Sequence, residues 1–144
     1  MRSLHTATIP PKHRLLIGEH NPSIRDFLVS VLHAEGYEVM AASNAEDLVN
    51  MLAVSLHPEI GSDRFELVIA EVRMLGHVGL SALTQFEDVP GAPPFVLIAG
   101  IADQQLNAQA SRSRALAILE DPVDMEDLLR VLRRLLGGAA ELIS

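Results

Sequence analysis

Acidic residues stand at the ends of three apolar runs in this sequence, and a histidine stands beside the first of them. Glu19 and His20 follow the run RLLIG, Glu71 follows LVIA, and Asp121 comes just after AILE. Carboxylates and an imidazole that meet in one place can bind a divalent metal ion, or they can share a proton. Whether these side chains meet depends on the elements that carry them.

Apolar runs and segments of helical periodicity alternate five times along the chain. We expect strands at residues 14–18, 37–42, 65–72, 95–100 and 115–120, and helices at residues 22–35, 43–53, 79–86, 102–112 and 124–136. Most strand segments are continuously apolar, which is typical of a parallel sheet covered by helices on both faces. The sequence therefore predicts a doubly wound α/β fold, in which functional residues gather at the carboxyl ends of the strands.

Local signals predict how several of these elements begin. Asn21 is a good N-cap and Pro22 suits the first position of the first helix. The stretch Ser43–Glu46 has the pattern of a capping box. Gly76 and Gly79 indicate a loop after the third strand. The apolar face expected for the first helix consists of Ile24, Phe27, Leu28, Val31 and Leu32.

Length and composition indicate one folded domain with few classes of partner. The chain has 144 residues, no cysteine and a formal net charge of −8. This charge repels phosphate backbones, so a nucleic-acid partner is not expected. No apolar stretch is long enough to span a bilayer and no signal peptide is recognisable, so we expect a cytoplasmic protein without a membrane partner. We expect a flexible lead-in at residues 1–13, the domain at 14–137 and a tail at 138–144.

Four segments in chain order resemble a known family. They are LLIGEHNPSIRDFL, LVIAEVRMLGHVGL, FVLIAGIAD and AILEDPVDMEDLL. Together they resemble the receiver domain of bacterial response regulators, the phosphoaccepting partner in two-component signalling. The resemblance runs from about His13 to Gly137. It implies a flavodoxin-like fold of five strand–helix units with strand order 2-1-3-4-5, and a role in phosphorelay signal transduction rather than enzymatic turnover.

The same resemblance implies a phosphorylation site whose residues depart from the family pattern. Glu19 and His20 stand at the acidic pair, and Glu71 stands at the phosphoacceptor aspartate. Ala99 stands at the hydroxyl position and Asp121 at the lysine position. Glu71 moves its carboxylate by roughly 1.5 Å relative to an aspartate, Ala99 donates no hydrogen, and Asp121 is negative where a phosphoryl group needs a positive charge. We therefore expect a degenerate receiver that is not phosphorylated.

Three interpretations of this altered pocket stay open. In the first, these are ordinary polar residues left after the chemistry was lost. In the second, Glu71 imitates a phosphorylated aspartate. In the third, Glu19, Glu71 and Asp121 converge with His20, which either takes up a proton or shares a divalent metal ion with Glu19 and Glu71. One histidine and two carboxylates suit manganese, iron or zinc better than magnesium. No other cofactor is expected.

The sequence thus predicts a stand-alone receiver-like signalling protein that binds a protein partner independently of phosphorylation. One alternative is a conventional phosphoacceptor relay that uses Glu71 or a neighbouring side chain. Another is a metal- or pH-sensing module built from Glu19, His20 and Glu71.

The last helix and the strand before it are the predicted interaction surface. Leu128, Val131, Leu132 and Leu135 can face the sheet, whereas Leu129 and Leu136 fall outside that stripe. Ile118 stands where the resemblance implies a switch aromatic. The resemblance also implies that the fourth helix, fifth strand and fifth helix bind a partner or a second copy. The alternative, that Leu129 and Leu136 only cover the sheet edge or the tail, stays open.

Overall fold

The computed structural model describes residues 13–57, 59, 64–100 and 104–137, and the expected lead-in and tail lie almost entirely outside them. Its strands are β1 (Arg14–Gly18), β2 (Glu38–Ala42), β3 (Leu67–Glu71), β4 (Phe95–Ala99) and β5 (Ala117–Glu120). Its helices are α1 (Pro22–Ala34), α2 (Ala45–Ser55), α3 (Val72–Glu87), α4 (Gln104–Ser111) and α5 (Met125–Leu136). Strands and helices alternate along the chain, as predicted.

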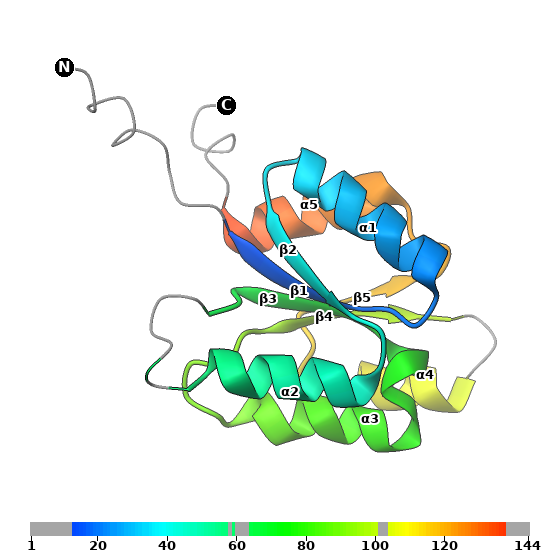
Figure 1. Ribbon diagram of the computed structural model, residues 1–144. Coiled ribbons are helices and arrows are strands. Elements are labelled where there is room, and N and C mark those ends of the chain that lie inside the picture. The colour runs from blue at the N-terminus through cyan, green and yellow to red at the C-terminus, as the bar shows by residue number, and fades with distance from the viewer. Residues whose placement is uncertain (1–12, 58, 60–63, 101–103, 138–144) are drawn as a thin grey trace.

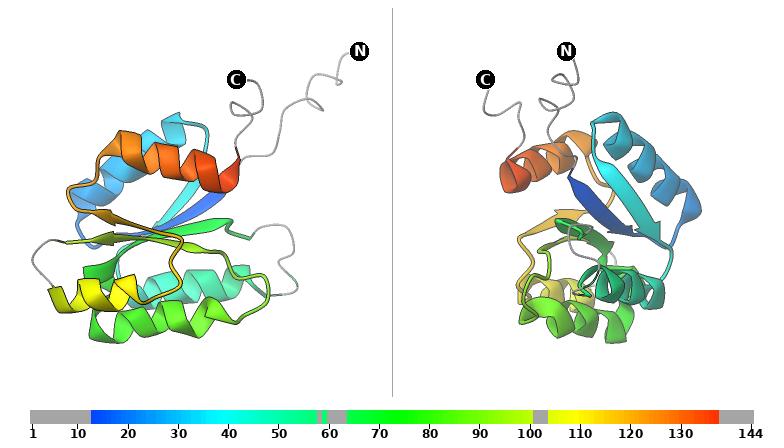
Figure 2. Two further views of the ribbon diagram at one scale, coloured as in Figure 1. Left: turned by 180° about the vertical axis from the view of Figure 1, so that it is seen from behind. Right: turned by 60° about the vertical axis from the view of Figure 1, so that its left-hand side comes forward.

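The five strands form one parallel sheet in the order β2-β1-β3-β4-β5, which confirms the predicted fold class and strand order. Helices α1 and α5 cover one face of the sheet, and α2, α3 and α4 cover the other (Figures 1 and 2). Because successive residues of a strand point to opposite faces, Leu16 of β1 belongs to the core under α2 and α3, whereas Leu15 and Ile17 belong to the core under α1 and α5.

Helix α1 begins as predicted, but it buries a narrower stripe than predicted. The Asn21 side chain accepts hydrogen bonds from the backbone N–H groups of Ser23 and Ile24, at 2.9 and 3.1 Å. Leu28 is buried, whereas Ile24 and Phe27 are 40% and 56% exposed. Ile24 and Phe27 therefore lie outside the buried face of α1, which packs on β1 and the edge strand β2 and shares a core with α5.

Helix α2 starts one residue later than its capping signal indicated. The N-cap is Asn44, whose side-chain oxygen accepts from the backbone N–H of Asp47 at 2.8 Å. The Asn44 amide also donates to the Asp47 carboxylate at 3.0 Å. The expected box at Ser43–Glu46 is therefore displaced by one residue, because the neighbouring pair has the same capping chemistry.

Helix α3 begins directly after β3, so the loop expected around Gly76 and Gly79 is wrong. Residues 72–75 contain no proline and include good helix formers, and a glycine inside a helix costs only about 1 kcal/mol relative to alanine. The helix therefore runs through both glycines, from Val72 to Glu87. As a consequence, Glu71 is at once the last residue of β3 and the N-cap residue of α3.

Within the described residues, none of the helices combines the length and the apolar content that crossing a membrane requires.

Candidate functional site

The ends of the two central strands bring three of the predicted residues together. Glu19 and His20 directly follow β1, and Glu71 ends β3. The register pairs Gly18 of β1 with Ala70 of β3, so the next residue of each strand lies at the same level. The strand order thus places the two glutamates side by side at the carboxyl edge of the sheet.

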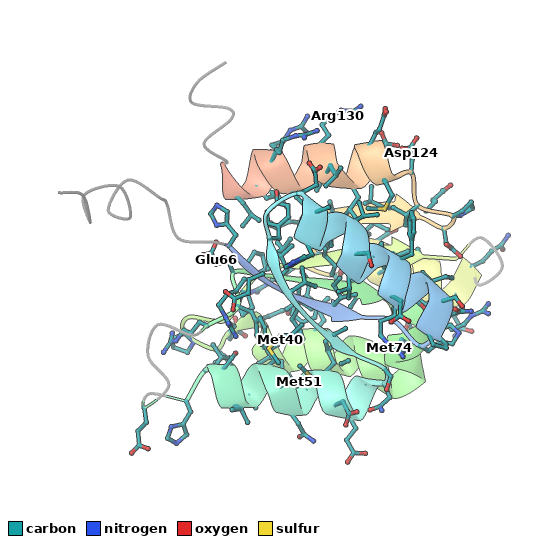
Figure 3. All side chains as sticks on the ribbon, turned by 45° about the horizontal axis from the view of Figure 1, so that its top comes forward. Met40, Met51, Glu66, Met74, Asp124 and Arg130 are labelled. Atoms are coloured by element: carbon teal, nitrogen blue, oxygen red, sulfur yellow. The ribbon has the colours of Figure 1, made fainter. Side chains whose placement is uncertain are left out.

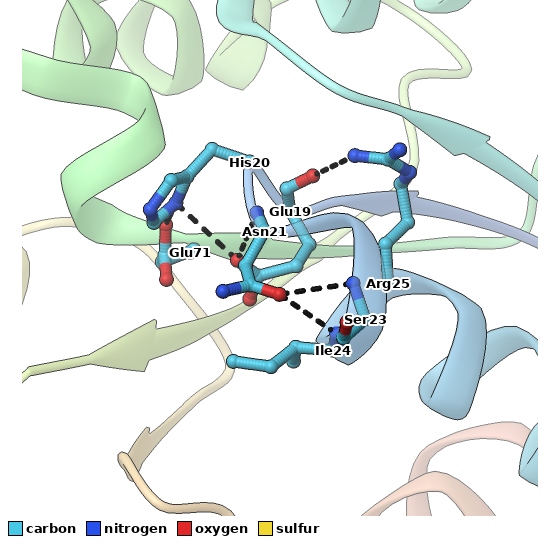
Figure 4. A network of polar contacts seen from close by, with 7 residues as sticks. All are labelled: Glu19, His20, Asn21, Ser23, Ile24, Arg25 and Glu71. Carbon is cyan, nitrogen blue, oxygen red and sulfur yellow. Dashed lines mark hydrogen bonds and ion pairs between the residues drawn. The ribbon is translucent and has the colours of Figure 1, made fainter.

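The three side chains form a compact cluster (Figure 4). Glu19 and Glu71 are only 3% and 9% exposed, whereas the His20 side chain is 53% exposed. His20 Nδ1 donates a hydrogen bond to Glu71 Oε1 and lies 3.3 Å from Glu19 Oε2. One nitrogen or oxygen atom from each residue lies within 4.8 Å of the other two. The predicted meeting of Glu19, His20 and Glu71 is present in the structure.

Local backbone geometry fixes the position of Glu19. Its Oε2 accepts a hydrogen bond from the backbone N–H of Asn21 at 3.0 Å. Its backbone carbonyl accepts from Arg25 Nη1 at 3.0 Å, and its backbone N–H donates to the carbonyl of Ala42 at 3.1 Å. The residue that caps α1 therefore also holds the Glu19 carboxylate, which ties the cluster to the start of that helix.

Burial raises the pKa of the Glu19 carboxyl group, because the charged form is poorly solvated there. The Asn21 N–H opposes this shift by stabilising the carboxylate. The neighbouring Glu71 adds to it through charge repulsion and a side-chain hydrogen bond, and His20 weakly opposes it. The net direction is upward, so Glu19 holds its proton more tightly than an exposed glutamate does.

Ala99 and Asp121 occupy the neighbouring strand ends but do not extend the cluster. Ala99 is buried at the end of β4, and its carbonyl accepts from the Asp121 N–H at 2.9 Å. The Asp121 side chain is exposed and lies outside the group formed by Glu19, His20 and Glu71. Strand β5 is two positions from β3, on the order of 10 Å, which a short aspartate side chain does not bridge. The expected convergence of Asp121 with the two glutamates is therefore wrong.

The residues of the predicted interaction surface differ in exposure. Ile118 of β5 is 38% exposed. Leu129 and Leu136 of α5 are half-buried and pack against the core under that helix. Their packing favours the covering role that the sequence left open, and the role of Ile118 in partner binding stays a prediction.

The structure adds two neighbours of the cluster that spacing alone did not reveal. Arg25 lies one turn into α1, and its guanidinium donates a hydrogen bond to the Glu19 backbone carbonyl. Met74 lies over Gly18, and a Cβ on that glycine would be 2.5 Å from Met74 Cε. A glycine before the acidic residue is the one sequence signal for this close approach.

The arrangement can hold a cation or a proton, and it offers no exposed nucleophile. Glu71 is buried and bonded by His20. Because their ligand atoms lie within 4.8 Å of one another, the imidazole and the two carboxylates can bind a divalent metal ion.

Comparisons with known proteins give a consistent result. The family model described as Response regulator receiver domain matches residues 15–133. The transcriptional regulatory protein AruR of Pseudomonas aeruginosa is 36% identical over 91 residues, which cover 63% of this chain and 36% of AruR. The response regulator receiver protein CpdR of Brucella abortus is 23% identical over 126 residues, which cover 88% of this chain and 98% of CpdR.

The fold is shared with solved receiver structures. The crystal structure of a response regulator receiver domain protein from Clostridium thermocellum aligns with a TM-score of 0.72 at 17% identity, covering 92% of this chain and 99% of that one. The chain spans only 25% to 36% of the length of several curated regulators that it matches.

Proposed function

The chain belongs to the response regulator receiver domain family, a signalling rather than a catalytic module. We propose that this protein signals without being phosphorylated. Its output in this proposal is binding to a protein partner, and Glu71 stands at the position of the phosphoacceptor aspartate. The observation that carries the proposal is the state of Glu71, which is buried and already bonded by His20.

The charges around Glu71 also oppose phosphorylation. A phosphoryl group brings close to two negative charges and needs hydrogen-bond donors and cations around it. Here the nearest acid, Glu19, is buried beside Glu71, and Ala99 offers no side-chain donor. The only lysine in the sequence is Lys12, which precedes β1. No described lysine is therefore present to neutralise a phosphoryl group.

Intact-mass measurement after incubation with acetyl phosphate and Mg²⁺ tests this proposal. We expect the unmodified protein to keep its mass. The matched control is a variant that combines His20→Asp, Glu71→Asp, Ala99→Thr and Asp121→Lys, which we expect to gain one phosphoryl group. A phosphorylated wild-type protein would overturn the proposal and favour the relay alternative, in which Glu71 or a neighbour accepts the group.

We propose that α4, β5 and α5 together form the surface that binds a partner. Ile118 is exposed on the edge strand β5. Exposed acidic residues gather at the start of α5 and exposed arginines in its last turn; they are Asp124, Glu126 and Asp127, and Arg133 and Arg134. This separation of charge suits an antiparallel second copy as well as a different protein. Sedimentation velocity on wild type and Ile118→Ser, with and without acetyl phosphate, tests self-association. We expect any association to be unaffected by the phosphodonor.

A second function, divalent metal sensing, is favoured by the meeting of Glu19, His20 and Glu71 within 4.8 Å. We propose that these residues would hold manganese, iron or zinc in preference to magnesium, because the imidazole nitrogen suits the transition metals. Such an ion would supply positive charge between the two buried carboxylates. Calorimetric titration with Mn²⁺, Zn²⁺ and Mg²⁺ tests this function. Binding of Mn²⁺ or Zn²⁺ that His20→Ala abolishes supports it, and equal binding by that variant contradicts it.

A further inference from the structure

Strand β2 is an edge of the sheet, and among the described residues no strand lies on its outer side. The N–H of Glu38 and the carbonyl of Ala42, at the two ends of β2, bond the backbone beside β1 at 2.9 and 3.1 Å. Because alternate residues of a strand direct their backbone groups to opposite sides, Met40 also faces β1, whereas Val39 and Ala41 direct theirs outward. The outer side of β2 therefore offers donors and acceptors for a further strand.

The sequence of β2 carries none of the usual features that prevent an edge strand from pairing. Such strands commonly contain proline, lysine, a bulge or an uncompensated charge. The segment EVMAA has no proline or lysine, and its one charged residue, Glu38, accepts from Arg14 Nη1 at 2.8 Å. Met40 is 44% exposed, and Val39 and Ala41 on the opposite face are half-buried. The edge therefore presents apolar side chains beside its outward backbone groups.

Helix α2 extends this surface with a stripe along its side next to β2. The stripe consists of residues at helical spacing that line the hollows between α2 and β2; they are Asp47, Asn50, Met51 and Val54. Met40 and Met51 line one groove of about 410 Å³ and lie next to each other (Figure 3). Val54 is 61% exposed. The middle of the α2 stripe therefore lies beside the middle of β2.

A two-fold axis through Met40 would pair β2 with its own copy in antiparallel orientation. Val39 of one copy then lies opposite Ala41 of the other, and these two residues can exchange both N–H···O=C bonds. The two Met40 residues lie opposite each other in a pair without hydrogen bonds, in which side chains are closest. This arrangement satisfies the outward backbone groups and buries the exposed methionine.

The same axis brings the two α2 helices into packing contact. Because α2 lies over both β1 and β2, its axis is about half a strand spacing inside the edge, which puts the two helix axes about 10 Å apart. Packed helices lie about 8 to 10 Å apart. Asp47 of one copy then lies beside Val54 of the other. The two Asp47 carboxylates are therefore at opposite ends of the helix pair and do not repel each other closely.

The size of this edge suits a weak dimer. Helices α1 and α2 have 13 and 11 residues, so the edge is about 16 to 20 Å long, and the two helices with the sheet between them are about 30 Å across. That is on the order of 500 to 600 Å² for each copy, the lower end of stable interfaces. The formal net charge of −8 on each copy opposes association, so moderate salt should strengthen it.

We propose that a second copy of this chain binds along β2 and α2, so that the two five-stranded sheets become one continuous sheet. A second copy fits better than a foreign strand because the backbone pattern of β2 and the stripe on α2 are symmetric about one axis. The surface of α4, β5 and α5 is then left to a different protein. The inference does not depend on whether Glu71 is phosphorylated.

Cysteine substitution tests the two-fold axis, since the sequence has no cysteine. In Met40→Cys, the two opposed residues would have Cα atoms about 4.5 Å apart, which a disulfide can bridge. Oxidised glutathione should therefore convert most of this variant into a covalent dimer on non-reducing electrophoresis. Val54→Cys is the matched control, because Val54 is more exposed but lies away from its own counterpart. Faster dimer formation by Val54→Cys would contradict the antiparallel arrangement.

Sedimentation velocity over a range of protein concentrations tests the edge without a cross-link. We expect wild type to form a dimer, and Val39→Pro to stay monomeric because it removes an outward N–H and no bond to β1. Met40→Glu should also stay monomeric, because two carboxylates would lie opposite each other, whereas Arg14 beside Met40 accommodates one within each copy. Leu116→Glu is the control. Leu116 is 53% exposed beside the opposite edge strand, so this variant should dimerise as wild type does.

Three results would overturn the proposal. The first is a wild-type protein that stays monomeric at every concentration in moderate salt. The second is a dimer that survives both Val39→Pro and Met40→Glu, with far-UV circular dichroism showing that each variant is folded. The third is a dimer lost only in Leu116→Glu, which would assign the second copy to α4, β5 and α5.

Discussion

The imidazole of His20 bonds the buried carboxylate of Glu71 across the ends of β1 and β3. This pair places one imidazole nitrogen close to both glutamates, since Glu19 Oε2 lies 3.3 Å from the same nitrogen. The imidazole therefore links the ends of the two central strands through the buried Glu71. Loss of the histidine would leave two buried carboxylates facing each other.

We therefore expect His20→Ala to lower the free energy of unfolding at pH 7 by about 1 to 2 kcal/mol, the cost of leaving a buried polar group unpaired. Urea denaturation measures this change. The matched control is His33→Ala, because His33 is an exposed histidine in the last turn of α1. An equal, small effect of both substitutions would show that the contact with Glu71 contributes little.

The raised pKa of Glu19 predicts how stability depends on pH. Because burial raises the pKa in the folded state, folding favours the protonated form. This contribution is fully present below about pH 4, the ordinary range of a glutamate, and is lost as the pH rises through the raised value. Glu19→Gln keeps a neutral side chain at every pH. Its unfolding free energy relative to wild type should therefore increase between pH 4 and pH 8.

Denaturation in EDTA across this pH range measures the Glu19→Gln effect without interference from metal ions. Glu35→Gln is the control, since Glu35 is exposed at the end of α1. Parallel pH curves for wild type and Glu19→Gln would contradict the prediction.

Much of the fold followed from local sequence signals because those signals agreed with one another. Continuous apolar runs identified the strands of a parallel sheet, and Asn21 with Pro22 fixed the start of α1. Because each helix returns the chain to the start of the next parallel strand, the ends of β1 and β3 lie at the same edge of the sheet, with Glu19 and Glu71 side by side. The start of α3 could not be predicted because the cost of Gly76 and Gly79 is small compared with the stabilisation a packed helix gains from its neighbours.

Contacts between distant elements were the less predictable part of the site. Asp121 stands at a strand end like Glu71, yet strand order alone does not show whether its short side chain reaches the cluster. Exposure of Ile24 and Phe27 depends on how far α1 overlaps the sheet, which helical periodicity does not encode. The contact of Met74 with Gly18 depends on α3 starting immediately after β3, so the error in that start concealed it.

Gly18 lies against the flexible end of the Met74 side chain, which occupies the space that a Cβ would take. A Cβ at Gly18 would lie 2.5 Å from Met74 Cε and 3.3 Å from Leu48 Cδ1. We expect Gly18→Ala to destabilise the fold by at most about 1 kcal/mol, because the flexible end of Met74 can shift to make room for the added methyl group. Thermal denaturation of Gly18→Ala, Met74→Ala and the double variant measures the coupling.

The double variant should lose less stability than the sum of the two single variants, because alanine at position 74 opens the space. Gly100→Ala is the matched control, since a Cβ there would meet no atom within 4 Å. Additive effects of Gly18→Ala and Met74→Ala would show that the overlap is relieved elsewhere.

Substitutions of the α5 leucines can distinguish a role in covering the core from a role in binding a partner. Leu132 is fully buried, whereas Leu129 and Leu136 are half-buried against the same core. We expect Leu132→Ala to cost about 2 to 5 kcal/mol, and Leu129→Ala or Leu136→Ala about 1 kcal/mol each. Ile118→Ser should change stability little, because Ile118 is 38% exposed at the sheet edge. Urea denaturation and sedimentation velocity on the same four variants measure both properties. Weaker association with unchanged stability in Leu129→Ala would instead place that leucine on the partner surface.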